Sequence, residues 1–556
     1  MIKLRDYQLK FKSAIYAAWE TARVVLGVLP TGGGKTITFS SIISEHKGAS
    51  IIVVHRREIL SQISVSLALI SEDLAEKGVC HRVIAPTSTI AMIRRKHLAR
   101  FGKSFIDPSA QTAVASVQTL TSASSMKNPR LQAFIAQVTL AVFDEGHHYI
   151  ETGFWARAVN LFDRAKILLV TATPERADGV GLGKGEGGFA EVMVEGPTVK
   201  ELMEHGNLCP YVYYCPESDA DFSGIAVNKD GDLNTAAMRA RVVESHLVGD
   251  LVSHYRQFAD GMQGIVFVDS IATANDCAAA FNAAGVSALA LSGETDDGER
   301  ERAISAYERG EVRLLINMDL FDEGFDVPQA QVCIGARPTM SLIKYMQQNG
   351  RVLRPAEGKT HAVIIDPVRN WERHGQVTWP RVWSLKGKDK ADRENSDTPK
   401  QRACLSCSQP YEAFRTECPY CHAVPVPPER TLPEHTDGDL FALDLEALEA
   451  MFRARNKANI TEDEFQQSLF ARKVPPIGHG QQIRRFRATK YRRDVLHNLI
   501  GWWVGAQPPG RSTREIQKRF YLRFGIDMVL VSALDLNETE DMIEKIARLF
   551  DKDLVA

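Results

Sequence analysis

Residues 24–36 read VVLGVLPTGGGKT, an apolar run that ends in three glycines followed by Lys35 and Thr36. The apolar run predicts a buried strand, and the amphipathic stretch after it predicts a helix. The glycines let the backbone curl so that its N–H groups face a phosphate, and the N-terminus of the helix adds a favourable dipole. Lys35 can then reach the β- and γ-phosphates, and the Thr36 hydroxyl can ligate Mg²⁺. The residues expected to bind a nucleotide here are Thr31, Gly32, Gly33, Gly34, Lys35 and Thr36.

Similar apolar runs recur on both sides of this motif, each of them short and followed by polar or turn residues. In the first 200 residues they are 24–30, 50–55, 112–117, 139–144 and 167–172. A second series, which begins near residue 235, comprises 264–270, 286–293, 312–318, 330–336 and 361–367. Short apolar strands that alternate with amphipathic helices are typical of parallel sheets buried on both faces. The sequence therefore predicts two tandem α/β domains, and the Gly-rich residues 178–189 are expected to form a flexible loop on the first.

Composition excludes several other classes of protein. The chain has 556 residues, with 67 Lys and Arg against 69 Asp and Glu, so it is not a globally basic binder. No apolar stretch reaches the roughly 18 residues that a membrane span requires, and the first residues lack the apolar core of a signal peptide. Nine cysteines in so long a chain do not form a disulfide framework and instead suit a reducing cytosol. We therefore expect a cytoplasmic protein with no membrane partner.

An acidic pair, Asp144 and Glu145, ends the apolar run 139–144. Ligands bind at the carboxyl ends of strands in an open parallel sheet, so the pair is expected beside the phosphate-binding turn. Asp144 is placed to hold Mg²⁺, directly or through water, and Glu145 to orient or deprotonate an attacking water. A solvated strand end would be the simpler reading of the pair alone, as a turn without a ligand would be for the glycines. Their order along the chain favours a nucleotide site.

Four of the nine cysteines cluster as two CxxC pairs separated by ten residues. They are Cys404, Cys407, Cys418 and Cys421. Two such pairs can place four thiolates tetrahedrally around Zn²⁺, and four protein ligands leave no open position for catalysis. The zinc is therefore expected to stabilise the module rather than to react. A redox CxxC and a disulfide pair are the alternatives.

The region from about residue 435 to 556 reads as mainly helical, with basic and aromatic residues interleaved between 472 and 493. Basic side chains neutralise phosphate and aromatic rings can stack on bases, whereas a solvated helix face is the common alternative. The residues expected to contact nucleic acid are Arg484, Arg485, Arg487, Arg492 and Arg493. Trp502 is expected to lie in the core of this region rather than to stack on bases.

Together, the phosphate-binding turn and the acidic pair resemble the superfamily 2 helicases of the DExH type. Further signatures of that family follow in its order: TATP at 171–174, DEGFDVP at 322–328 and QQNGRVLR at 347–354. Three more resemble upstream elements, namely RDYQ at 5–8, HRRE at 55–58 and SVQT at 116–119. The resemblance covers about residues 1–385 and is nearest to RadD-like and phage-encoded members that carry a cysteine module. Leu29 and Asn349 depart from the usual motif residues without changing a charged group.

The resemblance implies two RecA-like lobes with ATP between them. By resemblance the second lobe contributes Arg351, Arg354 and Gln347 to the catalytic site. Such arginines can increase the rate of hydrolysis by roughly 10³–10⁵, because they stabilise charge on the transferring phosphoryl group. The same family implies adenine and ribose contacts at Arg5, Gln8, Gly324 and Asp326. It implies coupling of nucleotide state to strand binding through His147, Thr171 and Thr173. It implies strand contacts at Arg56, Gln118 and Thr119.

The sequence hypothesis is an ATP-dependent helicase or translocase that uses Mg²⁺ and Zn²⁺ and acts on nucleic acid, DNA rather than RNA, in replication, recombination or repair. The expected segments are domain 1 at 1–200, a connector at 201–234, domain 2 at 235–385, a linker at 386–403, a zinc ribbon at 404–424 and a basic helical domain at 435–556. The competing hypotheses are an RNA helicase, the motor subunit of a restriction enzyme, and a nucleic-acid-binding scaffold with little turnover. Replication or repair proteins are expected as partners, and the sequence does not define the oligomeric state.

Overall fold

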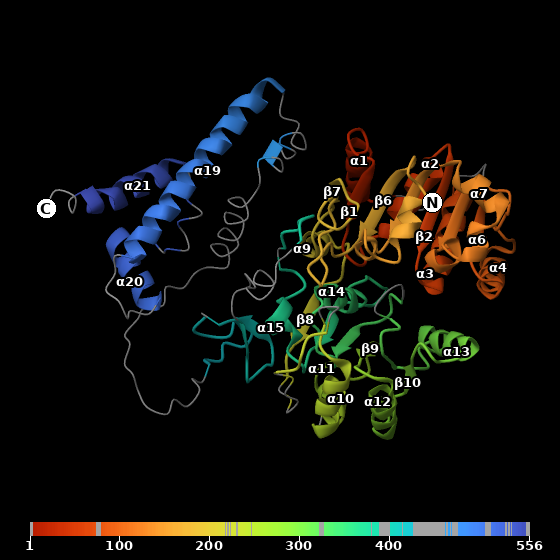
Figure 1. Cartoon of the computed structure of the whole chain (residues 1–556). Helices are drawn as coiled ribbons and strands as arrows, with labels where there is room; N and C mark the ends of the chain where they lie inside the picture. The colour runs from red at the N-terminus through yellow and green to blue at the C-terminus, as the bar shows by residue number, and fades with distance from the viewer. Residues whose placement is uncertain are drawn as a thin grey trace. The chain divides into compact units, whose positions relative to one another are not determined.

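The computed structural model divides the chain into two compact units, residues 1–433 and 434–556, which we describe separately (Figure 1). The continuous segments that the structure describes are 4–73, 79–216, 224–228, 232–245, 247–321, 327–379, 381–387, 401–413, 415–425, 476–505, 513–526 and 536–551. A few single residues between these segments are also described. The first unit contains two α/β lobes and the cysteine module.

The first lobe is a seven-stranded sheet in the order β3-β4-β2-β5-β6-β1-β7, and every pair of neighbours is parallel. The strands are β1 (Val24–Val28), β2 (Ala49–Val54), β3 (His81–Ile84), β4 (Thr112–Ser116), β5 (Val138–Asp144), β6 (Lys166–Thr171) and β7 (Val192–Glu195). The helices are α1 (Asp6–Ala18), α2 (Lys35–Glu45), α3 (Arg57–Asp73), α4 (Thr87–Phe101), α5 (Val117–Leu120), α6 (Ala123–Met126), α7 (Pro129–Ile135) and α8 (Ala156–Asn160), with the short 3₁₀ turn η1 (Gly146–His148). All five strands predicted for this lobe are confirmed, and β3 and β7 are added at its two edges.

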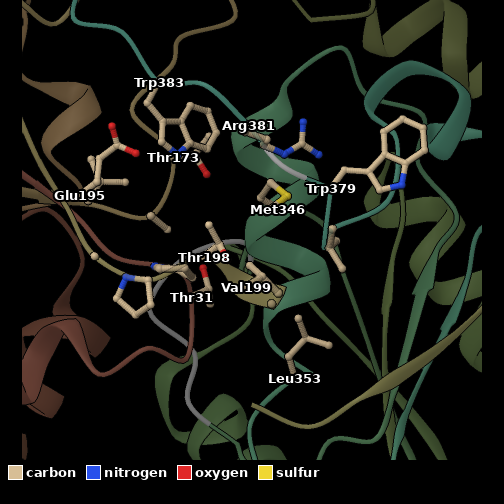
Figure 2. A pocket seen from close by; sticks show the side chains of 17 residues that line it. Thr31, Thr173, Glu195, Thr198, Val199, Met346, Leu353, Trp379, Arg381 and Trp383 are labelled. Carbon is tan, nitrogen blue, oxygen red and sulfur yellow. The ribbon is translucent and has the colours of Figure 1, made fainter. Parts of the chain in front are cut away.

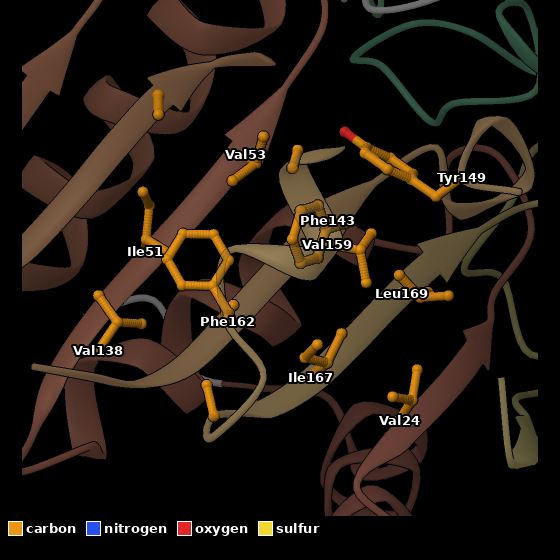
Figure 3. Close-up of a cluster of buried hydrophobic side chains, with 14 of the residues drawn as sticks. Val24, Ile51, Val53, Val138, Phe143, Tyr149, Val159, Phe162, Ile167 and Leu169 are labelled. Carbon is orange, nitrogen blue, oxygen red and sulfur yellow. The ribbon is translucent and has the colours of Figure 1, made fainter. Parts of the chain in front are cut away.

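Apolar side chains bury both faces of this sheet. Successive residues of β1 point to opposite faces, so Val24 and Leu26 join one cluster while Val25 joins the other. Figure 3 shows the first cluster, in which Phe143 and Phe162 pack among aliphatic side chains of the strands. Burial on both faces explains why these strands read as continuous apolar runs, and it fixes the strand ends at which the site is built.

The second lobe is a six-stranded parallel sheet in the order β10-β11-β9-β12-β13-β8. The strands are β8 (Tyr211–Tyr214), β9 (Gly264–Phe267), β10 (Ala288–Leu291), β11 (Leu314–Asn317), β12 (Val332–Gly335) and β13 (Ala362–Ile365). The helices are α9 (Val199–Glu204), α10 (Thr235–Glu244), α11 (Leu247–Ala259), α12 (Ile271–Ala283), α13 (Asp297–Glu308), α14 (Leu342–Gly350) and α15 (Asn370–His374). The five predicted strands are confirmed. The expected connector 201–234 contributes β8, which pairs with β13, so this lobe recruits an edge strand from a segment that reads as a linker.

The Gly-rich loop at 178–189 was expected to be flexible, and the structure instead packs it against a distant segment. Gly183 N–H donates to the Leu385 carbonyl at 2.8 Å. A Cβ added at Gly181 would lie 2.5 Å from the Gly387 nitrogen, so a larger residue would not fit there. The segment 381–387, which follows the second lobe, therefore returns to the first lobe and connects the two a second time.

The cysteine module is a small hairpin of the antiparallel strands β14 (Gln401–Ala403) and β15 (Pro410–Glu412). Its hydrogen bonds to the second lobe include two that involve the backbone of the module. Cys215 N–H donates to the Ser408 carbonyl at 2.5 Å, and Gln376 Nε2 donates to the Pro410 carbonyl at 3.3 Å. The module is thus fixed to the edge of the sheet at which β8 lies.

The second unit is helical, as predicted, with α19 (Pro476–Gly505), α20 (Thr513–Phe524) and α21 (Leu536–Asp551). Its small core includes Leu496, Trp503, Phe520 and Ile546. The expectation for Trp502 was wrong: this side chain is 67% exposed, because its neighbour Trp503 occupies the buried face of α19. Among the described residues, no helix combines the length and the apolar character needed to cross a bilayer.

Candidate nucleotide-binding cleft

The phosphate-binding turn connects β1 to α2 in the conformation that its glycines permit. Gly32 and Gly34 have φ angles of 82° and 81°, which side chains with a Cβ rarely adopt, and α2 begins at Lys35. Lys35 Nζ donates to the Leu29 carbonyl at 3.3 Å across the turn. The sequence prediction of a strand, a curled loop and a helix is therefore matched by the geometry, with Thr31 and Gly33 in the same loop.

The upstream motif packs directly on this turn. Tyr7 OH donates to the Gly33 carbonyl at 2.9 Å, and Gln8 Nε2 donates to the Gly34 carbonyl at 3.4 Å. Gln8 is buried, and its Oε1 accepts from the Arg5 backbone N–H at 2.9 Å. The motif RDYQ thus lies beside the nucleotide loop, as the resemblance implied, and the tyrosine is a supporting contact that sequence reasoning missed.

The acidic pair lies at the end of β5 and is almost completely buried. Burial, together with the neighbouring charge of Glu145, raises the pKa of Asp144 to about 7. Within the described part of the chain, Asp144 Oδ1 and Glu145 Oε2 have no hydrogen-bond partner. Two buried, unpartnered carboxylate oxygens beside a lysine are a suitable environment for Mg²⁺.

Lys35 completes this charged group. Burial lowers the pKa of its ammonium, while the negative charges of Glu145 and Asp144 act to raise it. The positive charges of Arg351 and Arg354, from the second lobe, lower it further. Charges from both lobes thus act on the same lysine.

Steric contacts between the lobes give the same result. A Cβ added at Gly350 would lie 2.5 Å from the Thr31 Cβ, and one added at Gly32 would lie 3.4 Å from the Arg354 Cγ. The C-terminal end of α14 therefore packs against the phosphate-binding turn. Gln347 on the same helix is buried, and neither atom of its amide has a hydrogen-bond partner among the described residues.

A chain of polar contacts joins the acidic pair to the segment 171–173. His147 Nδ1 lies 3.5 Å from Glu145 Oε2 and 3.0 Å from Thr171 Oγ1. Thr171 Oγ1 in turn donates to the Thr173 carbonyl at 3.2 Å. The three residues expected to couple nucleotide state to strand binding are thus brought together, and each is buried.

The residues expected to contact a strand lie beside the opening between the lobes. Arg56 Nη1 donates to the Asp319 and Leu320 carbonyls of the second lobe, both at 3.0 Å. Gln118 Nε2 donates to the His55 carbonyl at 3.0 Å. Gln118 is exposed and Thr119, one residue further on, is half-buried.

A salt bridge that sequence reasoning missed also joins the lobes. Arg300 Nη1 lies 3.1 Å from Glu58 Oε1. Glu58 is adjacent in sequence to the HRR segment, whereas Arg300 lies on α13 of the second lobe. No local pattern in the sequence connects the two residues, since 242 positions separate them. The expected nucleotide contacts Gly324 and Asp326 lie outside the described residues.

A small cavity, which the sequence did not predict, also lies between the lobes beside the phosphate-binding turn (Figure 2). Its volume is about 60 Å³, which is too small for a nucleotide. The residues that line it include Thr31 and Thr173 of the first lobe and Met346 of the second. Trp379, Arg381 and Trp383, which follow the last helix of the second lobe, line it as well. The cavity thus adjoins both the phosphate-binding turn and the coupling segment.

The cysteine cluster has the geometry of a metal centre. The four sulfur atoms all lie within 4.8 Å of one another, with Cys404 and Cys421 Sγ 3.5 Å apart and Cys407 and Cys418 Sγ 3.7 Å apart. A tetrahedral Zn²⁺ with Zn–S bonds of about 2.3 Å requires sulfur separations of about 3.8 Å. The four thiols therefore fit the ion that their spacing predicted.

Comparison with known proteins agrees with the cleft. Residues 1–176 match the family described as "Type III restriction enzyme, res subunit", and residues 246–356 match the "Helicase conserved C-terminal domain". A 51.5 kDa protein of a Lactococcus phage is 29% identical over 398 residues, which are 70% of this chain and 76% of that protein. Together, the two lobes, the cleft and these matches show that the chain belongs to the superfamily 2 helicases.

Two further relatives carry names that specify a substrate. The "DNA 3'-5' translocase XPB2" of Sulfurisphaera tokodaii is 23% identical over 403 residues, which are 66% of this chain and 82% of that protein. The "DNA 3'-5' helicase XPB" of Kineococcus radiotolerans is 24% identical over 371 residues, which are 63% of this chain and 57% of that protein. The chain thus spans little more than half of the second relative.

Proposed function

We propose that this protein is an ATP-dependent translocase that acts on DNA, with hydrolysis confined to the cleft between its two lobes. The observation that supports this most directly is the packing of the segment that carries Arg351 and Arg354 against the phosphate-binding turn. A Cβ added at Gly350 would lie 2.5 Å from the Thr31 Cβ, and one added at Gly32 would lie 3.4 Å from the Arg354 Cγ. Neither lobe alone holds both the phosphate-binding turn and these arginines. Hydrolysis is therefore coupled to closure of the lobes, and repeated closure moves a bound strand.

Each residue of the cleft has a distinct chemical task. Lys35 and the backbone of the turn bind the β- and γ-phosphates, and Thr36 and Asp144 hold Mg²⁺, which neutralises phosphate charge when it is bound. Glu145 orients the attacking water and accepts its proton. The guanidinium groups of Arg351 and Arg354 stabilise the charge that develops on the transferring phosphoryl group.

Gln347 and the coupling residues complete the proposed machinery. Neither polar atom of the buried Gln347 amide has a hydrogen-bond partner among the described residues, which suits a contact to the γ-phosphate or to the attacking water. The contacts from Glu145 through His147 to Thr171 give a route by which the nucleotide state reaches the strand-binding side of the first lobe. We assign His147, Thr171 and Thr173 to coupling rather than to the bond-breaking step.

On the lobes, we propose that Arg56, Gln118 and Thr119 contact the sugar-phosphate backbone. The carbonyls that accept from Arg56 belong to the second lobe, so a phosphate that binds this guanidinium competes with a contact between the lobes. Strand binding at this position would therefore change how the lobes meet. This is the physical form that coupling between DNA and ATP takes in our proposal.

In the helical unit, the exposed surface of α19 is the proposed DNA contact. Arg484, Tyr491 and Trp502 lie within about 20° of one another around a helix that turns 100° per residue, and all three are exposed. A cation and two aromatic rings in one row suit a phosphate and two bases. Of the other expected contacts, Arg485 is also exposed.

Three expected arginines of α19 already have partners inside this unit. Arg487 Nε donates to Glu462 at 2.8 Å, Arg492 Nε lies 3.1 Å from Glu540, and Arg493 Nη2 donates to the Leu534 carbonyl at 3.0 Å. Burial also lowers the pKa of Arg493. We assign the main contact to the row of Arg484, Tyr491 and Trp502, because these three side chains are exposed and aligned along the helix.

The choice of DNA can be tested with purified protein. ATP turnover is measured with forked, flush-ended and single-stranded DNA and with RNA of the same sequences, and release of a labelled strand is scored in parallel. Stimulation of turnover at least tenfold by DNA and weakly by RNA supports the proposal. The reverse order would support the RNA helicase, and turnover that persists in Arg351→Ala would refute the assignment of the cleft.

We further propose that the cysteine module binds one Zn²⁺ through Cys404, Cys407, Cys418 and Cys421. The supporting observation is the tetrahedral fit of the four sulfur atoms. The ion would close the hairpin loop between β14 and β15 and so keep the module docked on the second lobe. Its role is structural, because no ligand position is left open.

The match to a restriction-enzyme subunit favours one alternative, in which this chain is the motor of a restriction system. Plasmid DNA incubated with the protein, ATP and Mg²⁺ distinguishes the two. Cleavage products would support the restriction motor, whereas an intact plasmid with rapid ATP turnover supports the translocase.

A further inference from the structure

A lysine outside the recognised motifs lies directly beneath the two arginines. The Lys359 ammonium is surrounded by backbone carbonyl oxygens, those of Val352 at 2.5 Å, Ala330 at 2.7 Å, Arg354 at 2.9 Å and Pro328 at 3.5 Å. An ammonium has three N–H donors, so each of them has an acceptor within reach.

The local fold explains why this lysine reaches that position. Gly358 has a φ of 75°, and Lys359 N–H donates to the Ala356 carbonyl at 3.1 Å. The chain therefore turns back shortly after the QQNGRVLR motif. The side chain then reaches the carbonyls of Val352 and Arg354, which lie in the turn that follows the end of α14 at Gly350.

The four carbonyls belong to two different segments. Val352 and Arg354 are in the segment that carries the arginines, whereas Pro328 ends the DEGFDVP motif and Ala330 lies two residues beyond it. Lys359 therefore ties together two motifs, 322–328 and 347–354, that are separated by 18 residues. The connector adds a further fixed point, because Cys209 N–H donates to the Leu353 carbonyl at 2.7 Å.

We propose that Lys359 is a positioning residue, which holds Arg351 and Arg354 where they can contact the γ-phosphate. It does so by clamping the backbone of the arginine segment to the end of the DEGFDVP motif. The inference rests on the proposed hydrolysis in the cleft. Lys359 does not touch the nucleotide, and its effect passes through the backbone of the arginine segment.

The clamp is expected to depend on pH. Burial lowers the pKa of Lys359 to about 8, while the Cys209 thiol acts to raise it and the Arg354 guanidinium to lower it. A neutral amine has one donor fewer and turns a lone pair toward an oxygen acceptor. The clamp therefore weakens as the pH rises through about 8.

The first test replaces Lys359 by Met, which keeps the length of the side chain and removes its donors. We expect kcat for ATP to fall about 10- to 100-fold while KM for ATP changes less than threefold, because the arginines act on the transition state rather than on nucleotide binding. Lys47→Met removes one exposed lysine from the first lobe and is expected to keep the wild-type kcat. Wild-type kcat in Lys359→Met, or a rise in KM alone, would overturn the proposal.

The second test follows the ratio of wild-type to Lys359→Met turnover from pH 7 to pH 9.5. The ratio should fall toward one above about pH 8, because the wild-type lysine then loses the charge that the methionine variant never has. A constant ratio would indicate a merely structural role and would overturn the proposal. If Lys359→Met does not fold, Lys359→Arg serves, because arginine stays charged and should show no alkaline loss relative to pH 7. An alkaline loss in Lys359→Arg equal to that of the wild type would overturn it too.

Arg351→Ala separates this inference from the proposed function. Turnover that survives in Arg351→Ala refutes the cleft itself. An inactive Arg351→Ala beside a fully active Lys359→Met refutes only the clamp.

Discussion

Replacement of Gly350 by alanine should separate the two lobes while it leaves each of them folded. The new Cβ would lie 2.5 Å from the Thr31 Cβ and 2.8 Å from its Cγ2. Carbon atoms in contact prefer a separation of about 3.8 Å, so the surfaces must move apart by about 1 Å. A Cβ cannot rotate away as a longer side chain could. The two surfaces of the cleft must therefore move apart.

This displacement moves Arg351 away from the phosphate that it is proposed to meet. A misplacement of about 1 Å can cost about 10² in rate, or about 2.7 kcal/mol, so we expect kcat for ATP to fall about 100-fold. KM for ATP should change less than kcat, since no residue of the turn is replaced and Lys35 stays in the first lobe. A steady-state assay of phosphate release at saturating DNA measures both quantities.

Two further variants make the Gly350→Ala experiment decisive. Gly249→Ala is the matched control, because an added Cβ at this exposed position of α11 meets no atom within 4 Å. It should keep full activity and gain up to about 1 kcal/mol of stability from helix propensity. Thr31→Gly removes the opposing atoms, so the double variant should be more active than Gly350→Ala alone. Wild-type kcat in Gly350→Ala would refute the packed cleft.

Three other results are expected. The pKa of Asp144 is raised to about 7, so below that pH its carboxylate must lose a proton before it can bind Mg²⁺. The Mg²⁺ concentration for half-maximal turnover should therefore rise up to about tenfold for each pH unit below pH 7. An equal Mg²⁺ requirement at pH 6 and pH 8 would contradict this prediction. Purified protein should contain one zinc per chain by atomic absorption and Cys418→Ser should lose it, whereas unchanged zinc in the variant would count against the site. Glu58→Gln should weaken closure by about 1 kcal/mol and slow turnover about fivefold without a change in the melting temperature; a normal rate would show that the bridge to Arg300 does not hold the closed state.

The sequence predicts the central strands of both sheets and misses three edge strands for one physical reason. A strand with neighbours on both sides and helices over both faces must be apolar along its whole length, which is a local signal. The missed strands β3, β7 and β8 lie at sheet edges and have only partly buried side chains. These three edge strands therefore lack the continuous apolar run by which the others, including the edge strand β10, are recognised.

Loops and helix faces show the same difference between local and distant information. Glycines at 178–189 indicate flexibility when they are read locally, and only the return of residues 381–387 shows that close packing requires them. A basic run predicts a nucleic-acid surface, yet Arg487, Arg492 and Arg493 have protein partners that lie 25 or more residues away. The choice between Trp502 and Trp503 for the core depends on the rotation of one helix.

The motifs on which the proposed chemistry rests could be read from the sequence alone, because a phosphate-binding turn, an acidic strand end and paired CxxC motifs are each complete within a few residues. How these motifs meet was decided by the tertiary structure. Packing between residues more than 200 positions apart sets Gly350 against Thr31 and joins Arg300 to Glu58. Such contacts follow from how the two sheets are docked, and no periodicity along the chain records that docking.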